Sequence, residues 1–216
     1  MSKISALSLD FWNTIGIPNN EFGIRRNEYL SQKSGKSYEE VERIYKEIKS
    51  NLDRRAADFG EDVPNEECWN ILGKKLNIDN DEHFKFLVFH IQQNLFYQLS
   101  PIILRETIIE LYRINSKGVK INIASNTNFI KGRYIKNLIA RNEIPIDFFV
   151  FSDEVGAAKP NKVFFDKVKS LYSCPPNEIL HCGDCEEFDI VGAEAAEFQS
   201  KLIKNAFELP KFLKTI

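Results

Sequence analysis

The chain has 216 residues, a length that suits one domain or one core with an inserted subdomain. Its net charge of −2 and its lack of a long basic run argue against a nucleic-acid partner. No apolar run approaches the ~20 residues that a membrane span requires. The N-terminus also lacks the charged flank and long apolar stretch of a signal peptide. We therefore expect a cytoplasmic protein with no membrane contact and no nucleic-acid partner.

Two of the four cysteines form a CxxC spacing at Cys182 and Cys185. A redox motif of this kind needs a thioredoxin-like context, and a zinc site needs a second pair of ligands. Neither is visible in the sequence, and the neighbouring His181 is typical of a buried histidine at a strand end. We therefore assign no redox or zinc role to this pair.

The N-terminal half begins with a short buried strand, predicted over 3–10. Residues 17–99 then differ in character, because glycine is sparse and apolar residues recur at helical spacing. Ser37 and Glu40 form a capping box at the start of one helix. We interpret this region as an inserted subdomain of four helices. They are predicted over about 22–33, 38–58, 64–77 and 79–98.

From about residue 100 the pattern changes to alternating helices and strands. Pro101 is predicted to open a helix that ends near Gly118. This alternation is typical of a parallel sheet covered by helices on both faces, so we predict an α/β fold. The strands are predicted over about 119–125, 148–151, 179–182 and 201–203, and further helices over about 129–141, 163–171 and 188–197.

Polar residues punctuate this α/β part at points where strands end. Ser125 follows the second predicted strand, and Asp184 follows a later one, with Asp189 five residues beyond it. Lys159 lies in a loop just before a helix. Because the carboxyl ends of parallel strands meet at one edge of a sheet, these groups and Asp10 are expected to share one crevice.

Such a set of groups suits phosphoryl transfer. A divalent cation held by carboxylates offsets the repulsion between an anionic phosphate and an attacking carboxylate. A lysine adds positive charge, and a serine hydroxyl with backbone N–H groups binds the remaining phosphate oxygens. Aspartate is an established covalent nucleophile, and Mg²⁺ favours a few carboxylates plus water. We therefore expect Mg²⁺ as cofactor and a phosphorylated small molecule as substrate.

The order of these motifs resembles the haloacid dehalogenase-like (HAD) hydrolase superfamily, in its phosphatase-like branch with a helical cap. The resemblance implies a Rossmann-like core over 1–16 and 100–216, and an all-helical cap over 17–99. Four stretches carry it: Asp10-Phe11-Trp12-Asn13-Thr14, Ser125-Asn126, the segment 152–160 that ends in Lys159-Pro160, and the segment 181–193 that contains Gly183-Asp184 and Asp189.

Carried over by position, the resemblance implies a metal site around Asp10. Asp10 would be both the nucleophile and a metal ligand. The backbone carbonyl of Trp12 would be a second ligand and Asp184 a third. Asp189 would be either a further ligand or a support for the others.

The same resemblance implies roles for the remaining motif residues. Ser125 would bind the phosphoryl oxygens, and Lys159 would position and neutralise Asp10 and the phosphate. Thr14 would brace the loop around the nucleophile. Together with Trp12 and Asn126, Thr14 is also expected to contribute to substrate binding.

Trp12 departs from the phosphatase pattern. Phosphatases of the superfamily have a second aspartate two residues after the nucleophile, which protonates the leaving oxygen and later activates water. Tryptophan does neither, and a general acid–base group typically contributes ~10²–10⁴-fold to the rate. We therefore expect weak turnover of ordinary phosphomonoesters and a smaller loss for substrates with good leaving groups, such as aryl or acyl phosphates.

Two other functions stay open. Dehalogenases of the superfamily also have an aromatic residue at this position, although they need no metal and Asp184 and Asp189 look like metal-binding residues. A non-catalytic member that binds a phosphate ligand or a protein partner is the third interpretation. Four arginines of the helical insert are candidates to reach an anionic substrate or, alternatively, lie on a solvated helix face: Arg25, Arg26, Arg54 and Arg55.

Overall fold

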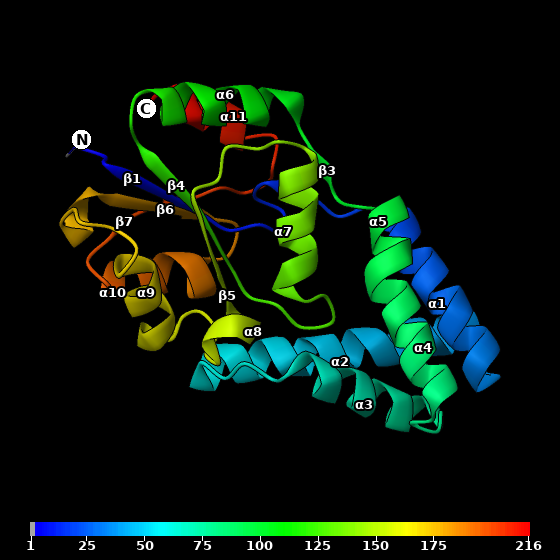
Figure 1. Cartoon of the computed structure of the whole chain (residues 1–216). Helices are drawn as coiled ribbons and strands as arrows, with labels where there is room; N and C mark the ends of the chain where they lie inside the picture. The colour runs from blue at the N-terminus through cyan, green and yellow to red at the C-terminus, as the bar shows by residue number, and fades with distance from the viewer. Residues whose placement is uncertain (1–2) are drawn as a thin grey trace.

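The computed structural model describes residues 3–216 and contains a five-stranded parallel sheet with the strand order β5-β4-β1-β6-β7 (Figure 1). The parallel sheet predicted from the alternating pattern is thus confirmed. The N-terminal strand lies at its centre, between two neighbours that come from the second half of the chain. The strands are β1 (Ala6–Leu9), β4 (Lys120–Ser125), β5 (Phe148–Phe151), β6 (Ile179–Gly183) and β7 (Gln199–Leu202).

Helices cover both faces of this sheet, because successive side chains of a strand point to opposite faces. Leu7 and Leu9 of β1 pack into the cluster that contains the apolar residues of α6, α7 and α11. Ala6 joins a second cluster, built on α9 and α10. These helices are α6 (Arg105–Ser116), α7 (Gly132–Arg141), α8 (Ser152–Val155), α9 (Lys162–Lys169), α10 (Gly192–Ala195) and α11 (Leu209–Leu213).

The inserted region is helical, as predicted, and has a hydrophobic core of its own around Trp69, Leu72 and Phe84. The side chain of Ser37 accepts a hydrogen bond from the backbone N–H of Glu40 at 3.2 Å, which confirms this cap. The helices are α1 (Asn20–Ser34), α2 (Tyr38–Phe59), α3 (Asn65–Leu76), α4 (Glu82–His90) and α5 (Phe96–Gln98), the last two joined by a π-helical turn η1 (Ile91–Leu95).

The prediction that Pro101 opens a helix is wrong. Ile102–Ile103 form a short strand β3, which pairs antiparallel with β2 (Gly16–Ile17), and α6 begins only at Arg105. Two β-branched residues in succession favour extended backbone, but the pairing partner lies far away in the sequence. The two connections between sheet and helical region therefore run side by side.

Two other predicted helices differ from those in the structure, one in the residue at which it begins and one in its helix type. The helix predicted over 129–141 begins at Gly132. The helix predicted over 188–197 is a π-helical turn η3 (Glu186–Val191) followed by the short α10. Both shifts lie at the edge of the sheet where the polar motifs gather. The division of the chain at residues 16 and 100 into core and cap stays a prediction.

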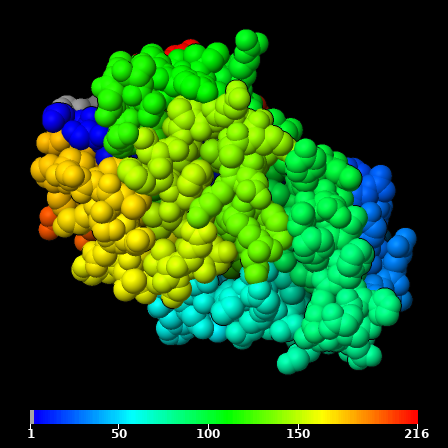
Figure 2. Space-filling model, viewed as in Figure 1, coloured from blue at the N-terminus to red at the C-terminus, as the bar shows by residue number. Residues whose placement is uncertain are grey.

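The helical region also contacts the core at a second place, around the α2–α3 connection. The backbone N–H of Ala158 donates to the carbonyl of Gly60 at 3.0 Å. The indole N–H of Trp69 donates to the carbonyl of Phe129 at 3.1 Å, and the side-chain amide of Asn65 donates to the carbonyl of Asn128 at 2.6 Å. Figure 2 shows the two parts packed against each other across one face of the molecule. Within residues 3–216, no helix is both long and apolar enough for a membrane span.

Candidate active site

Asp10 follows the central strand directly, and its backbone N–H donates to the carbonyl of Cys182 in β6 at 2.8 Å. The chain then turns sharply, with the N–H groups of Ile15 and Gly16 both donating to the carbonyl of Phe11. A Cβ atom on Gly16 would lie 2.7 Å from the Phe11 ring, so this turn needs glycine. The turn leaves the Asp10 carboxylate at the sheet edge rather than along a continuing strand.

Two segments, the end of β4 and the loop before α9, bring polar groups to this carboxylate. Oδ1 of Asp10 accepts hydrogen bonds from Ser125 Oγ at 2.9 Å and from the ammonium of Lys159 at 2.7 Å. All three side chains are buried. Residues 10, 125 and 159, which the sequence placed in one crevice, therefore lie in direct contact in the structure.

Lys159 is fixed at both its main chain and its side chain. Asn126 accepts from the backbone N–H of Lys159 at 2.7 Å and donates to its carbonyl at 3.0 Å. The peptide bond to Pro160 is cis. At the other end, the ammonium contacts Oδ1 of Asp189 at 2.5 Å as well as Asp10. Asn126, expected to bind substrate, thus also holds Lys159, and both ends of its amide are engaged there.

Both oxygens of Asp189 are engaged by neighbouring groups. Oδ1 contacts Lys159 and the Nε2 atom of His181 at 3.1 Å, while Oδ2 accepts from the backbone N–H of Cys185 at 3.0 Å. A Cβ atom on Gly183 would lie 2.0 Å from the Asp189 carboxyl carbon, so glycine before Asp184 makes room for this carboxylate. Of the two roles expected for Asp189, these contacts favour support over direct metal ligation.

Asp184 faces Asp10 from the end of β6. Its Oδ2 accepts from the side-chain amide of Asn13 at 3.0 Å. Asn13 has a backbone φ of 56°, a left-handed conformation that asparagine tolerates better than most residues. The sequence analysis missed this contact, because it depends on the backbone of a turn whose shape no local pattern reveals.

Charge and burial shift the pKa values of this cluster in opposite directions. Burial, together with the nearby charges of Asp189 and Asp184, raises the pKa of Asp10 to about 7, even though Lys159 lowers it. Burial also raises the pKa of Asp189, but Lys159 and His181 outweigh that effect and hold it well below its usual range. Burial lowers the pKa of Lys159, and its two carboxylate partners reverse this and keep it charged.

A cavity of about 730 Å³ opens above these groups, between the sheet edge and helices α1 and α2. Trp12 lines it, half-buried, with its ring 5.0 Å from that of Phe11 and 6.3 Å from that of Phe96. Arg26 also lines the cavity, with its guanidinium 3.4 Å from the centre of the Tyr45 ring. The cavity is large enough for a small organic substrate.

The arginines of the insert differ in their surroundings. Arg25 pairs with Glu21 and Glu28, and Arg55 pairs with Glu61, while Arg54 is exposed. Arg26 is half-buried and its guanidinium donates twice to the Asn27 side chain. Of the four, it is the one that lines the cavity. Thr14 is fully buried outside the cavity lining, and its hydroxyl has no hydrogen-bond partner among residues 3–216.

The residues present fit a Mg²⁺ ion. The second oxygen of Asp10 and Oδ1 of Asp184 accept no hydrogen bond from residues 3–216, nor does the main-chain oxygen of Trp12. These are hard oxygen donors, and a cation would relieve the buried negative charge that raises the Asp10 pKa. Among the described residues, no group of three or more His, Cys, Asp or Glu side chains is arranged for a metal. The ligand set therefore depends on two carboxylates and one carbonyl.

A model of the haloacid dehalogenase-like hydrolase family matches residues 4–197. The chain belongs to this family. The match includes the core strands β1, β4, β5 and β6, the helical insert and every residue of the candidate site. A comparison with curated protein sequences finds no match.

Solved structures with the same fold include both phosphatases and dehalogenases. A HAD phosphatase from Thermococcus onnurineus is 19% identical, with a TM-score of 0.65, and the alignment covers 97% of this chain and 98% of that one. The HAD-hydrolase YfnB from Bacillus subtilis, solved with magnesium bound, is 16% identical with a TM-score of 0.74 and coverages of 99% and 100%. L-2-haloacid dehalogenase from Xanthobacter autotrophicus is 17% identical, with a TM-score of 0.64 and coverages of 93% and 77%. At these identities the likeness extends to the fold alone.

Proposed function

We propose that this protein is a Mg²⁺-dependent phosphatase-like hydrolase that acts through a covalent phosphoryl intermediate on Asp10. The observation that carries the proposal is the buried contact of Asp10 with Lys159 and Ser125, beside Asp184, whose Oδ1 accepts no hydrogen bond from residues 3–216. A lysine ammonium and a hydroxyl against a nucleophilic carboxylate suit an anionic substrate, because they balance charge where phosphate binds.

In the first half-reaction one carboxylate oxygen of Asp10 attacks phosphorus, and the bond from phosphorus to the leaving oxygen breaks. Lys159 balances the negative charge that Asp10 and the phosphoryl oxygens share, and the Ser125 hydroxyl donates to one of those oxygens. In the second half-reaction water attacks phosphorus, which releases inorganic phosphate and restores the Asp10 carboxylate. Bound Mg²⁺, held by Asp10, Asp184 and the Trp12 carbonyl, supplies further charge neutralisation.

Trp12 shapes the expected substrate range. No titratable side chain replaces the missing general acid at this position, so the leaving oxygen departs without a proton from it. Aryl and acyl phosphates tolerate this because their leaving groups are weakly basic. The aromatic side chains of Trp12, Phe22 and Tyr45 line the cavity and suit a substrate with a flat apolar part.

The proposal is tested with purified protein, Mg²⁺ and 4-nitrophenyl phosphate. We expect metal-dependent release of nitrophenol by the native chain and a loss of at least about a thousandfold in Asp10→Asn. Asn51→Asp, a substitution of similar size at an exposed position of α2 outside the cavity lining, controls for a general effect on folding. Equal activity of native protein and Asp10→Asn would exclude the covalent mechanism.

Dehalogenation of a 2-haloacid is the second candidate, favoured by the aromatic side chain at position 12. Halide leaves without a proton, so the missing acid would cost nothing in that reaction. The Oδ1 atom of Asp184, which accepts no hydrogen bond from residues 3–216, argues against it, since this second carboxylate beside the nucleophile would repel an anionic haloacid in a metal-free site. Release of halide from 2-chloropropionate in the presence of EDTA would favour dehalogenation, and no release by protein that hydrolyses 4-nitrophenyl phosphate would exclude it. Binding of phosphate without turnover on either substrate would favour the non-catalytic interpretation.

A further inference from the structure

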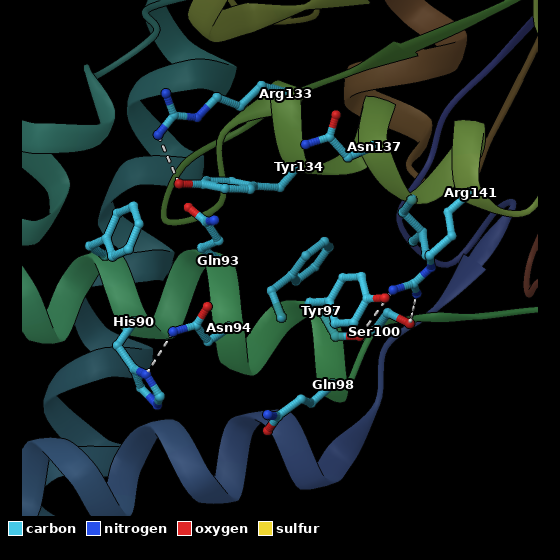
Figure 3. A pocket seen from close by; sticks show the side chains of 13 residues that line it. His90, Gln93, Asn94, Tyr97, Gln98, Ser100, Arg133, Tyr134, Asn137 and Arg141 are labelled. Carbon is cyan, nitrogen blue, oxygen red and sulfur yellow. Dashed lines mark hydrogen bonds between the residues drawn. The ribbon is translucent and has the colours of Figure 1, made fainter.

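A second cavity lies outside the catalytic cleft, in the seam between the helical region and the core. It has a volume of about 670 Å³ and is bounded by α4, η1 and α5 on one side and by α7 on the other (Figure 3). We call it the seam groove. No residue lines both the seam groove and the catalytic cavity. Phe96 forms part of the wall between them, because it lines the groove and its ring packs against Trp12 and Phe22.

The lining of the seam groove has an unusual charge balance. It contains two arginines, Arg133 and Arg141, and no aspartate or glutamate. Neither arginine forms an ion pair with a carboxylate of residues 3–216, whereas Lys131 and Lys136, close to them in the sequence, pair with Glu66 and Glu154. In a chain with a net charge of −2, this is a local excess of positive charge.

Aromatic rings hold both guanidinium groups in place. Arg133 donates to the Tyr134 hydroxyl at 2.8 Å and lies 4.8 Å from the centre of that ring. Arg141 lies 4.1 Å from the centre of the Tyr97 ring and donates to the Ser100 hydroxyl at 3.3 Å. Stacking on a ring pre-organises the planar donor fork and leaves N–H groups for an acidic partner.

Polar and apolar groups alternate between the two arginines. The carboxamides of Gln93 and Asn137 reach into the groove and form no hydrogen bond with other described residues, whereas the side chain of Gln98 points away from α7 (Figure 3). Phe89 and Phe96 supply apolar surface beside them. Gln93 belongs to the π-helical turn η1, and such turns within helices occur frequently at functional sites.

We propose that the seam groove binds an elongated organic anion with two acidic groups and a flat apolar middle. Arg133 and Arg141 are eight residues apart on one helix, which separates them by about 12 Å along its axis. One acidic group would meet each guanidinium, the carboxamides would bond polar atoms between them, and the flat part would lie on Phe89 and Phe96. This site is independent of the reaction proposed for Asp10.

The test uses biphenyl-4,4′-dicarboxylate as probe and its neutral diamide as the matched control, with ¹⁵N-labelled protein. We expect saturable shifts of the side-chain amide signals of Gln93 and Asn137 with the dicarboxylate, and none with the diamide. Removing charged hydrogen-bond donors in Arg133→Gln/Arg141→Gln should weaken binding about tenfold or more. Arg43→Gln, which removes one positive charge from α2, and Arg26→Gln in the catalytic cavity should bind the probe as the native chain does.

Several results would overturn the proposal. These are the absence of saturable shifts at the groove amides, equal binding of the diamide, and shifts confined to residues of the catalytic cavity. Circular dichroism checks that the double variant folds. If it does not, the milder Gln93→Ala/Asn137→Ala variant takes its place and should also weaken binding; unchanged binding in that variant would contradict the proposed site.

Discussion

The ammonium nitrogen of Lys159 lies 2.7 Å from Oδ1 of Asp10, in a setting where Lys159 is only 2% exposed and Asp10 5%. The same nitrogen contacts Asp189, so one buried cation balances two buried carboxylates. This arrangement holds Lys159 charged and fixes it against the proposed nucleophile. It also leaves the site with surplus negative charge, which a cation between Asp10 and Asp184 would offset.

Substitution of Asp189 should damage both stability and rate. Asp189→Asn removes one partner of a buried ion pair, which typically costs about 3–5 kcal/mol in free energy of unfolding. The Lys159 ammonium also loses its second anchor, so the rate of aryl phosphate hydrolysis should fall. Urea unfolding and steady-state kinetics measure the two effects, with exposed Glu187→Gln as the control. An unchanged unfolding midpoint would show that Lys159 is held by Asp10 alone.

Restoring a general acid at position 12 should change the substrate range. Trp12→Asp should raise the rate on an alkyl phosphate by about 10²–10⁴-fold and the rate on 4-nitrophenyl phosphate much less, because only the alkyl leaving group needs a proton. The ratio of kcat/KM for the two substrates measures the effect. Trp12→Phe serves as control and should leave that ratio unchanged. A similar gain on both substrates would mean that Trp12 limits access rather than proton transfer.

Asn13 should strengthen Mg²⁺ binding through its hydrogen bond to Asp184. Groups that orient a metal ligand typically contribute about 10–100-fold to affinity, so Asn13→Gly should raise the Mg²⁺ concentration for half-maximal activity by that factor. Glycine keeps the left-handed backbone that position 13 requires. Asn77→Gly, at another left-handed asparagine that ends α3, is the matched control. The same Mg²⁺ dependence in both variants would show that Asn13 does not contribute to Mg²⁺ affinity.

Asp62 should make stability depend on pH. It lies in the α2–α3 connection, where burial, together with the charge of Asp153, raises its pKa to about 6. The folded chain therefore keeps this proton to higher pH than the unfolded chain, and stability falls as pH rises from about 4 to about 6. Asp62→Asn should stabilise the protein at pH 7.5 by about 1 kcal/mol, after allowance for partial exposure, and have little effect at pH 4. Thermal unfolding at both pH values, with exposed Asp58→Asn as control, measures this; an equal effect at both would contradict it.

The sequence predicted the sheet, the helical insert and the meeting of Asp10, Ser125 and Lys159, because hydrophobic periodicity and strand ends are local signals. It did not predict the β2–β3 ribbon, since that pairing joins residues far apart in the chain. It also missed the π-helical turn η1 and the contact of Asn13 with Asp184, which depend on backbone geometry within a helix and a turn. Asn126 is a similar case. Its motif indicated that it belongs to the site, but not that its side chain forms hydrogen bonds with the Lys159 backbone.

The most direct test of the account is to trap the intermediate. Native protein is mixed with Mg²⁺ and excess 4-nitrophenyl phosphate, quenched in acid during turnover and digested for mass spectrometry. The account predicts that the peptide containing Asp10 gains the mass of one phosphoryl group, that hydroxylamine removes it, and that Asp10→Asn shows no such peptide. Turnover by native protein with phosphate found on another residue, or undiminished turnover in Asp10→Asn, would contradict the account.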